Sequence, residues 1–171
     1  EGADGERVEY ERFKSKVDDE CEFEGLATDM RGNRLLLLCK DLRKKADIDT
    51  LAIYPWPLDT REVDQSARID LPIPEISAAL RTRRLHPSGI VVDPRTGHLL
   101  IVAAREHGLI ELTADGDFVA ARRLPLAARH PQAEGIELTA DGRIVIADEA
   151  GYGRARLSIY GADKTAAAER R

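Results

Sequence analysis

The sequence contains one pattern three times, and this repeat constrains the fold more than any single residue does. Each copy has a glycine, a short apolar run, a polar turn with another glycine, and a second apolar run. The copies are CEFEGLATDMRGNRLLLLCKD from Cys21, HPSGIVVDPRTGHLLIVAARE from His86 and HPQAEGIELTADGRIVIADE from His130. Turns that tolerate positive φ, placed between short apolar runs, are typical of β-hairpins. The repeat therefore predicts three hairpins.

A third apolar run follows each hairpin, and the middle copy continues into ADGDFVAARRL at 114–124, a turn plus a fourth strand. A matching segment, ADGERVEYERF, lies at 3–13. Four antiparallel strands in about 40–45 residues form one blade of a β-propeller. Three blades do not close a ring, because propellers typically have about four to eight. The missing blades come from a longer parent chain, which we favour because an open half-propeller exposes apolar faces, or from a second copy.

We therefore predict an all-β fold, a partial β-propeller of four-stranded antiparallel blades over residues 1–160. Pro74 and Glu75 favour a short helix between the first blade and the second. The predicted parts are the fourth strand of a preceding blade at about 6–14, blades at about 21–71 and 86–124, an incomplete blade at about 132–160, and a polar tail at 161–171.

Composition excludes several classes of function. The formal net charge of -5 does not favour nucleic acid or anionic membranes as partners. No apolar run approaches the ~20 residues that a membrane span needs. The two cysteines and four histidines lack the spacing of a zinc site. The sequence also lacks phosphate-loop, dinucleotide, serine-hydrolase and zinc-protease motifs, so it names no catalytic residue.

Glu24-Gly25 and Glu134-Gly135 stand at equivalent positions in two copies, and Ser88 replaces the acid in the middle copy. In a propeller the first strand of each blade lines the central channel, so these side chains should lie near its mouth. Two converging carboxylates repel unless a cation or a proton joins them. They would suit Ca²⁺ or another divalent cation. In the alternative, both glutamates bond backbone amides and link adjacent blades.

Charged residues also follow the second apolar runs. In an antiparallel hairpin this region lies beside the start of the first strand. Carboxylates on one side of the channel mouth and cations on the other would bind a polar or anionic ligand. A ring of salt bridges between blades is the alternative. The candidate ligand residues are Lys40, Ser88, Arg105, Asp148 and Glu149.

Cys21 and Cys39 flank one predicted hairpin and lie almost opposite each other. A cross-strand spacing of about 5.5 Å permits a disulfide, which we expect if the protein is exported. In the alternative they are small buried hydrophobic residues.

The three repeated blocks, in this order over most of the chain, resemble the SdiA-regulated family of bacterial β-propellers, the YjiK-like group. The resemblance implies a six-bladed propeller, exported to the periplasm or held in the cell envelope, whose N-terminal half is missing here. The lactonase type of propeller is similar, with a glutamate near a first strand that binds a divalent metal.

We therefore expect a non-enzymatic module that binds a ligand or protein partner at the channel mouth, with a divalent cation held by Glu24 and Glu134. The alternative is a metal-dependent hydrolase of the lactonase or phosphodiesterase type, with Asp148 or Glu149 as general base. A purely structural scaffold is the third hypothesis.

Overall fold

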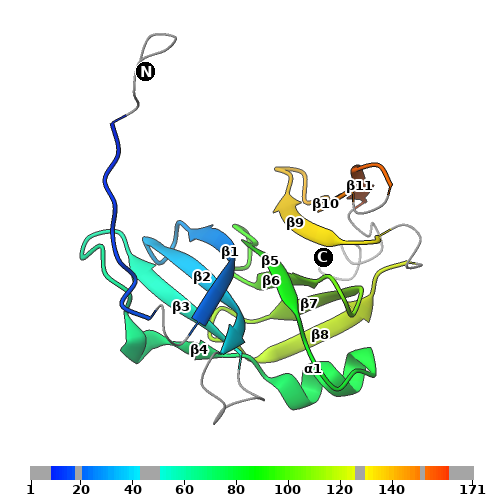
Figure 1. The fold of residues 1–171 in the computed structure, drawn as a ribbon, viewed down its shortest axis with the longest axis horizontal. Helices are drawn as coiled ribbons and strands as arrows, with labels where there is room; N and C mark the ends of the chain where they lie inside the picture. Colours follow the sequence, from blue (N-terminus) through cyan, green and yellow to red (C-terminus); the bar gives the residue numbers. More distant parts are fainter. Residues whose placement is uncertain (1–8, 18–20, 43–50, 126–129, 151–152, 162–171) are drawn as a thin grey trace, which may run out of the picture.

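The computed structural model describes residues 9–17, 21–42, 51–125, 130–150 and 153–161, which form three antiparallel sheets (Figure 1). The first sheet has the order β1-β2-β3-β4, with β1 (Cys21–Asp29), β2 (Arg34–Leu42), β3 (Ala52–Pro57) and β4 (Ile69–Asp70). The second has the order β5-β6-β7-β8, with β5 (Pro87–Val92), β6 (Leu99–Ala103), β7 (Gly108–Leu112) and β8 (Phe118–Arg123). The third has the order β11-β10-β9, with β9 (Ala133–Leu138), β10 (Ile144–Asp148) and β11 (Arg156–Tyr160).

The three sheets follow one another in space as they do in the chain, from blue and cyan through green to yellow and orange in Figure 1. The first strands of neighbouring sheets contact each other, β1 with β5 and β5 with β9. This is the arrangement of consecutive propeller blades around a channel. The prediction of a partial propeller with about three blades' worth of strands is confirmed.

Each first hairpin closes through a residue with positive φ, at Asn33 (48°), Gly97 (82°) and Gly142 (81°). Asp29 supports its turn by accepting hydrogen bonds at Oδ1 from the backbone N–H groups of Arg31 (3.1 Å) and Gly32 (3.0 Å). The turn chemistry expected from the repeat is present, because Gly and Asn reach this region of φ with little strain.

Buried aliphatic side chains join each sheet to the next. Leu38 and Ile53 of the first sheet pack against Ile90 and Ile101 of the second. A smaller cluster joins the second sheet to the third and includes Val91, Val102, Ile136 and Ile146. Both apolar faces of the second sheet are therefore covered, which explains why its strands read as continuous apolar runs rather than as alternating ones.

The predicted connecting helix is confirmed as α1 (Ile73–Leu80), which has a proline in its first turn. Its buried residues are Ile73, Ile76 and Leu80, and all three belong to the core between the first two sheets. Burying one such side chain stabilises a fold by about 1.5–3 kcal/mol. Arg123 of β8 donates two hydrogen bonds to the carbonyl oxygen of Leu80, at 3.1 and 2.7 Å, and so ties the helix end to the second sheet.

Residues 9–17 form no strand; Val17 packs against the first sheet, and the segment extends away from the sheet toward residue 9 (Figure 1). The structure therefore differs from the predicted strand at about 6–14, of which residues 6–8 lie outside the described part. A strand needs a partner edge, and the prediction assigned this one to a preceding blade, of which the three described sheets contain no strand. Side chains hold the segment instead: Val17 is buried, and the ring of Phe13 packs edge-on against Trp56 at 5.6 Å.

A short 3-10 helix, η2 (Gln65–Ala67), connects β3 to β4. At the other end of the chain, β11 forms an edge of the third sheet. Its side chains Leu157 and Ile159 are 67% and 55% exposed. The predicted tail at 161–171 lies outside the described residues after Gly161.

Candidate functional site

The residue before the first glycine of each repeat lies at a β-bulge. In β1, Phe23 pairs with Cys39 and Gly25 with Leu38, so Glu24 has no partner across the hairpin. Ser88 of β5 and Glu134 of β9 are skipped by the same one-residue shift. A bulge leaves one residue unpaired and redirects its side chain. The repeat thus builds three equivalent redirected positions at the same end of three adjacent strands.

The three bulged side chains have different partners. Glu24 accepts a hydrogen bond from the ammonium group of Lys40 at 2.6 Å. Ser88 is buried, and its hydroxyl donates to the carbonyl oxygen of Ala133 at 2.5 Å, which links the second sheet to the third. Glu134 accepts from the side-chain amide of Gln132 at 3.1 Å. Glu24 and Glu134 therefore bond side chains of their own blade, whereas Ser88 bonds the second sheet to the third.

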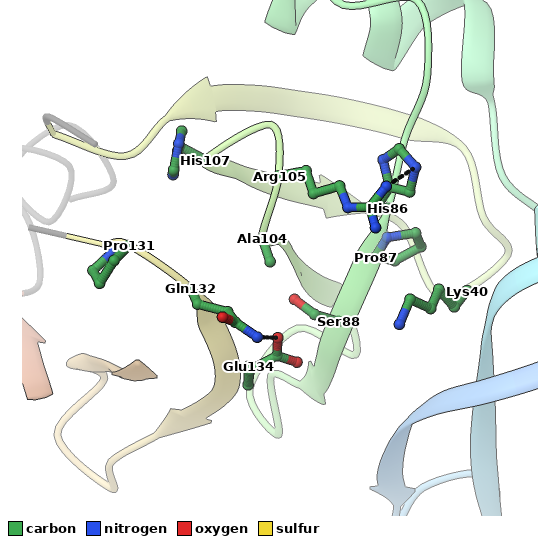
Figure 2. Close-up of a pocket in the computed structure, with 10 residues that line it drawn as sticks. All are labelled: Lys40, His86, Pro87, Ser88, Ala104, Arg105, His107, Pro131, Gln132 and Glu134. Carbon is green, nitrogen blue, oxygen red and sulfur yellow. Dashed lines mark hydrogen bonds between the residues drawn. The ribbon is translucent and has the colours of Figure 1, made fainter. Parts of the chain in front are cut away.

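A pocket of about 430 Å³ lies at this end of the strands (Figure 2). All three sheets and their connections contribute to its wall, which places the pocket across blade boundaries. Its lining residues are Lys40, His86, Pro87, Ser88, Ala104, Arg105, His107, Pro131, Gln132 and Glu134. Of the predicted site residues, the structure brings Lys40, Ser88, Arg105 and Glu134 together here. Glu24 contacts Lys40 but is not itself part of the lining.

One wall of the pocket contains a chain of three polar side chains. Glu106, which is 9% exposed, accepts hydrogen bonds from the backbone N–H of His86 (3.0 Å) and from its Nδ1 (2.8 Å). Arg105 Nη1 lies 3.2 Å from His86 Nε2. Because guanidinium groups only donate, Nε2 must be the acceptor. We therefore assign the proton of His86 to Nδ1, which makes the ring neutral.

Lys40 adds a positive charge to the pocket. The hydrogen bond to Glu24 raises the pKa of Lys40 above its ordinary value of 10.5, and the charges of Glu22 and Glu134 act in the same direction. Burial opposes this shift but does not reverse it. Lys40 is therefore protonated at neutral pH.

Asp148 lies away from the predicted channel mouth, whereas Glu149 shares the amide of Gln132 with Glu134, near the predicted position. The side chain of Asp148 is fully buried, and its Oδ2 lies 2.8 Å from Nδ1 of the equally buried His130. His130 Nε2 is hydrogen-bonded to the hydroxyl of Tyr160. Glu149 is exposed and accepts from the amide of Gln132 at 2.6 Å. Neither acid lines the pocket.

The bulge explains the misplacement of Asp148. The shift at Glu134 pairs Asp148 with Ala133, the register position that Cys39 and Ala103 occupy in the other two sheets. All three of these β-strand residues are buried. An alignment by sequence alone groups Asp148 with charged residues, because it does not show which side of the sheet the bulge selects.

Three polar residues of the pocket were not among the predicted site residues, His86, His107 and Gln132, nor was the supporting Glu106. One signal was available: His86 and His130 both begin a repeat and precede proline. Both turn out to bond a buried carboxylate, from Glu106 and Asp148 respectively. The partner acids could not be chosen from spacing, since Asp148 is the last residue of β10 whereas Glu106 lies in the turn after β6.

Cys21 and Cys39 form a disulfide with a Cα–Cα distance of 5.6 Å. It joins β1 to β2 directly beside the bulge that carries Glu24. Lys40, which follows Cys39, is also skipped in the pairing of the two strands. The disulfide therefore ties together the two strands that carry the Glu24–Lys40 ion pair.

The sheet order, the adjacent first strands and the pocket at one end of them define the chain as part of a β-propeller. The chain belongs to the SdiA-regulated family, whose sequence profile matches residues 4–149 and also residues 77–169. The resemblance noted from the repeated blocks is confirmed.

Solved structures of similar fold include a luciferin-regenerating enzyme (TM-score 0.52, 12% identity), which aligns with 82% of this chain and 45% of its own. A streptogramin B lyase aligns with TM-score 0.51 and 12% identity, over 85% of this chain and 42% of its own. The virginiamycin B lyase of Staphylococcus aureus aligns with TM-score 0.52 and 12% identity, over 89% and 45%. This chain thus spans less than half of each protein's length, and identities this low show the fold alone.

No functionally curated protein has significant sequence similarity to this chain. Within the described residues, no helix is both long and apolar enough to cross a membrane. The same residues contain no group of three or more His, Cys, Asp or Glu side chains arranged to hold a metal ion.

Proposed function

We propose that this chain is a non-enzymatic propeller module that binds a polar ligand, or a polar group of a protein partner, in the pocket at the end of β1, β5 and β9. The observation that carries the proposal is the pocket itself. It has a volume of about 430 Å³, which is within the range of small-molecule sites. Its wall combines basic, imidazole, amide, hydroxyl and carboxylate side chains.

The hydrogen bonds of the pocket residues support ligand binding in addition to contact between blades. Ser88 uses its hydroxyl to join two blades, whereas the amide of Gln132 bridges Glu134 and Glu149 without closing the pocket. Polar groups held by neighbours before a ligand arrives lose little conformational entropy when it binds.

A divalent cation at Glu24 and Glu134 fits these residues less well. The Glu24 carboxylate is already neutralised by Lys40 at 2.6 Å, and the Lys40 ammonium group would repel a second cation. Calcium prefers six to eight oxygen ligands, about two of which these carboxylates could supply with one bond each. Calorimetric titration of the wild type and the Glu24→Gln/Glu134→Gln double variant with Ca²⁺ tests this: saturable heat that the double variant loses would establish the cation.

The binding proposal is tested by filling the pocket. Ala104 lies in the turn between β6 and β7 and lines the pocket, so Ala104→Trp places an indole inside it. Ala140→Trp is the matched control, because Ala140 is an exposed turn residue at the other end of its hairpin. Both variants and the wild type are screened by NMR against acids, amines, amides and sugars. We expect ligands that shift wild-type resonances to be lost from Ala104→Trp and retained by Ala140→Trp.

Equal binding by both variants would contradict the proposal, as would a screen in which no compound binds. The hydrolase alternative makes a different prediction. Turnover of a lactone or phosphoester panel by the wild type, abolished by Ala104→Trp, would favour it over the binding module.

The disulfide supports a location in an oxidising compartment such as the periplasm, because disulfides persist there and are rare in reducing cytosol. Alkylation before and after reduction, followed by mass spectrometry of protein isolated from its native compartment, tests this. Two thiols alkylated without reduction would argue against export.

A further inference from the structure

We propose that the pocket recognises the anionic group of its ligand, a carboxylate or a phosphate, through the guanidinium of Arg105 with Lys40 as a second cation. This inference rests on the proposed binding function and names the class of ligand.

The charges that line the pocket differ from those of the chain as a whole. The chain as a whole is acidic, with a formal net charge of -5. The pocket lining departs from this balance, since it contains Lys40 and Arg105 but a single acid, Glu134. The pKa of Lys40 is raised by its bond to Glu24, so Lys40 keeps its charge. Lys40 shares its charge with Glu24, so Arg105 is the lining cation that meets an anion without an acid partner among the described residues.

Arg105 is held differently from other arginines of the chain. Several arginines at the surface pair with acids, such as Arg34 with Asp29 at 2.8 Å and Arg95 with Asp93 at 2.9 Å. Arg105 instead lies 3.2 Å from the neutral ring of His86. The imidazole orients the guanidinium but does not cancel its charge.

The orientation begins at a buried acid. Glu106 holds both the backbone and the ring of His86, and the ring then accepts from Arg105. The carboxylate of Glu106 bonds His86 behind the pocket lining, whereas the guanidinium of Arg105 lines the pocket (Figure 2). Glu106 and His86 are therefore positioning residues for Arg105.

Arg105 also has donors to spare. A guanidinium has five N–H groups in a planar fork, which matches the two oxygens of a carboxylate or phosphate. One of these groups is used on His86. The wall thus presents a positioned cation whose remaining N–H donors a ligand can use.

The experiment uses acetate and acetamide, which have nearly the same shape and differ in charge. Small probes enter the pocket whatever the shape of the natural ligand, and inorganic phosphate tests the second kind of anion. Binding is followed at constant ionic strength through the ¹⁵N–¹H resonance of Arg105 Nε and the backbone amides around it. We expect saturable shifts with acetate or phosphate, and affinity for acetamide at least about tenfold lower, as for loss of a charge-assisted bond.

Arg105→Met should weaken anion binding by at least about tenfold, while Arg105→Lys, which keeps the charge and loses the fork, should fall in between. Arg122→Met is the matched control, because Arg122 is an exposed arginine of β8 outside the pocket lining. It removes the same charge and should bind anions as the wild type does. Arg105 is itself exposed, so its variants should fold, which thermal unfolding checks.

The positioning role is read from Glu106→Gln. We expect the ¹⁵N shifts of His86 to lose the Nδ1–H form, together with weaker acetate binding; unchanged His86 shifts would overturn this role. The anion with the stronger Arg105-dependent binding identifies the ligand as a carboxylate or a phosphate.

Two results would overturn the anion inference: equal binding of acetate and acetamide, or binding by Arg105→Met equal to that of Arg122→Met. If neutral compounds bind the wild type and are lost from Ala104→Trp while anions do not bind, the anion inference fails and the pocket proposal stands. If no compound binds at all, both fail.

Discussion

Gly25, Gly89 and Gly135 are equivalent in the repeat, but we expect them to differ in how well they tolerate an added side chain. A Cβ added to Gly89 would lie 2.8 Å from the backbone carbonyl oxygen of Glu134 in the next sheet. At Gly135 the nearest atom would be the Cβ of Ala147, at 3.3 Å. Gly25 is intermediate, with side-chain carbons at 3.0 and 3.1 Å. The requirement at Gly89 is therefore close approach of two blades rather than positive φ.

These distances predict that Gly135→Ala stabilises the fold and that Gly89→Ala destabilises it. Replacing a strand glycine by alanine where there is room stabilises a protein by about 0.4–1 kcal/mol, because the unfolded chain has fewer conformations to lose. We expect Gly135→Ala to fall in or slightly below this range. Overpacking costs about 1–3 kcal/mol, and at Gly89 the opposing atom is backbone and cannot rotate away. The net effect of Gly89→Ala is then a loss of up to about 2.5 kcal/mol in the free energy of unfolding.

Urea denaturation of the wild type, Gly25→Ala, Gly89→Ala and Gly135→Ala measures the difference. The expected order of stability is Gly135→Ala, then Gly25→Ala, then Gly89→Ala. A Gly89→Ala variant as stable as Gly135→Ala would refute the idea that backbone approach between blades sets this position. Because Glu134 lines the pocket, Gly89→Ala should also weaken ligand binding.

Three further predictions concern stability and titration. Reducing the disulfide of the first hairpin, whose cysteines are 18 residues apart, should lower the free energy of unfolding by about 3 kcal/mol in urea titrations with and without dithiothreitol; no change would contradict this. The hydrogen bond from Arg95 holds the pKa of Asp93 below 3.8, so its contribution is present above that pH and is lost as pH falls through the folded pKa. Unfolding measured between about pH 6 and pH 2 should therefore depend less on pH in Asp93→Asn. Glu24→Gln should lower the pKa of Lys40, and faster acetylation of that amine at about pH 9–10, followed by mass spectrometry, checks this; an unchanged rate would count against the ion pair.

The fold was predictable because its determinants are local. Short apolar runs bounded by turn glycines define hairpins, and their threefold repetition defines blades. The helix between the first two blades was also predictable, because Pro74 and Glu75 favour a first turn and the helical pattern buries Ile76 and Leu80. The strand expected at about 6–14 did not form within the described residues, because strand formation depends on an available partner edge and not on the segment alone.

The site was predictable only in part. The repeat brought out Glu24, Ser88 and Glu134 as equivalent, and the structure places all three on bulges. It placed Lys40 near Glu24 without indicating their ion pair, and it did not indicate that Asp148 would turn inward to His130. Such partners depend on which face of a sheet a bulge selects, and a shift of one residue exchanges the two faces.

By itself, the sequence determined the kind of fold, the number of blades represented and the equivalence of the three positions that precede the first glycine of each repeat. These follow from backbone preferences and hydrophobic periodicity, which act over a few residues. Only the tertiary structure decided that Arg105 is oriented by a neutral histidine and a buried glutamate, and that residues from three sheets share one pocket. Contacts of this kind join residues far apart in the chain, so their geometry exists only after the blades have packed.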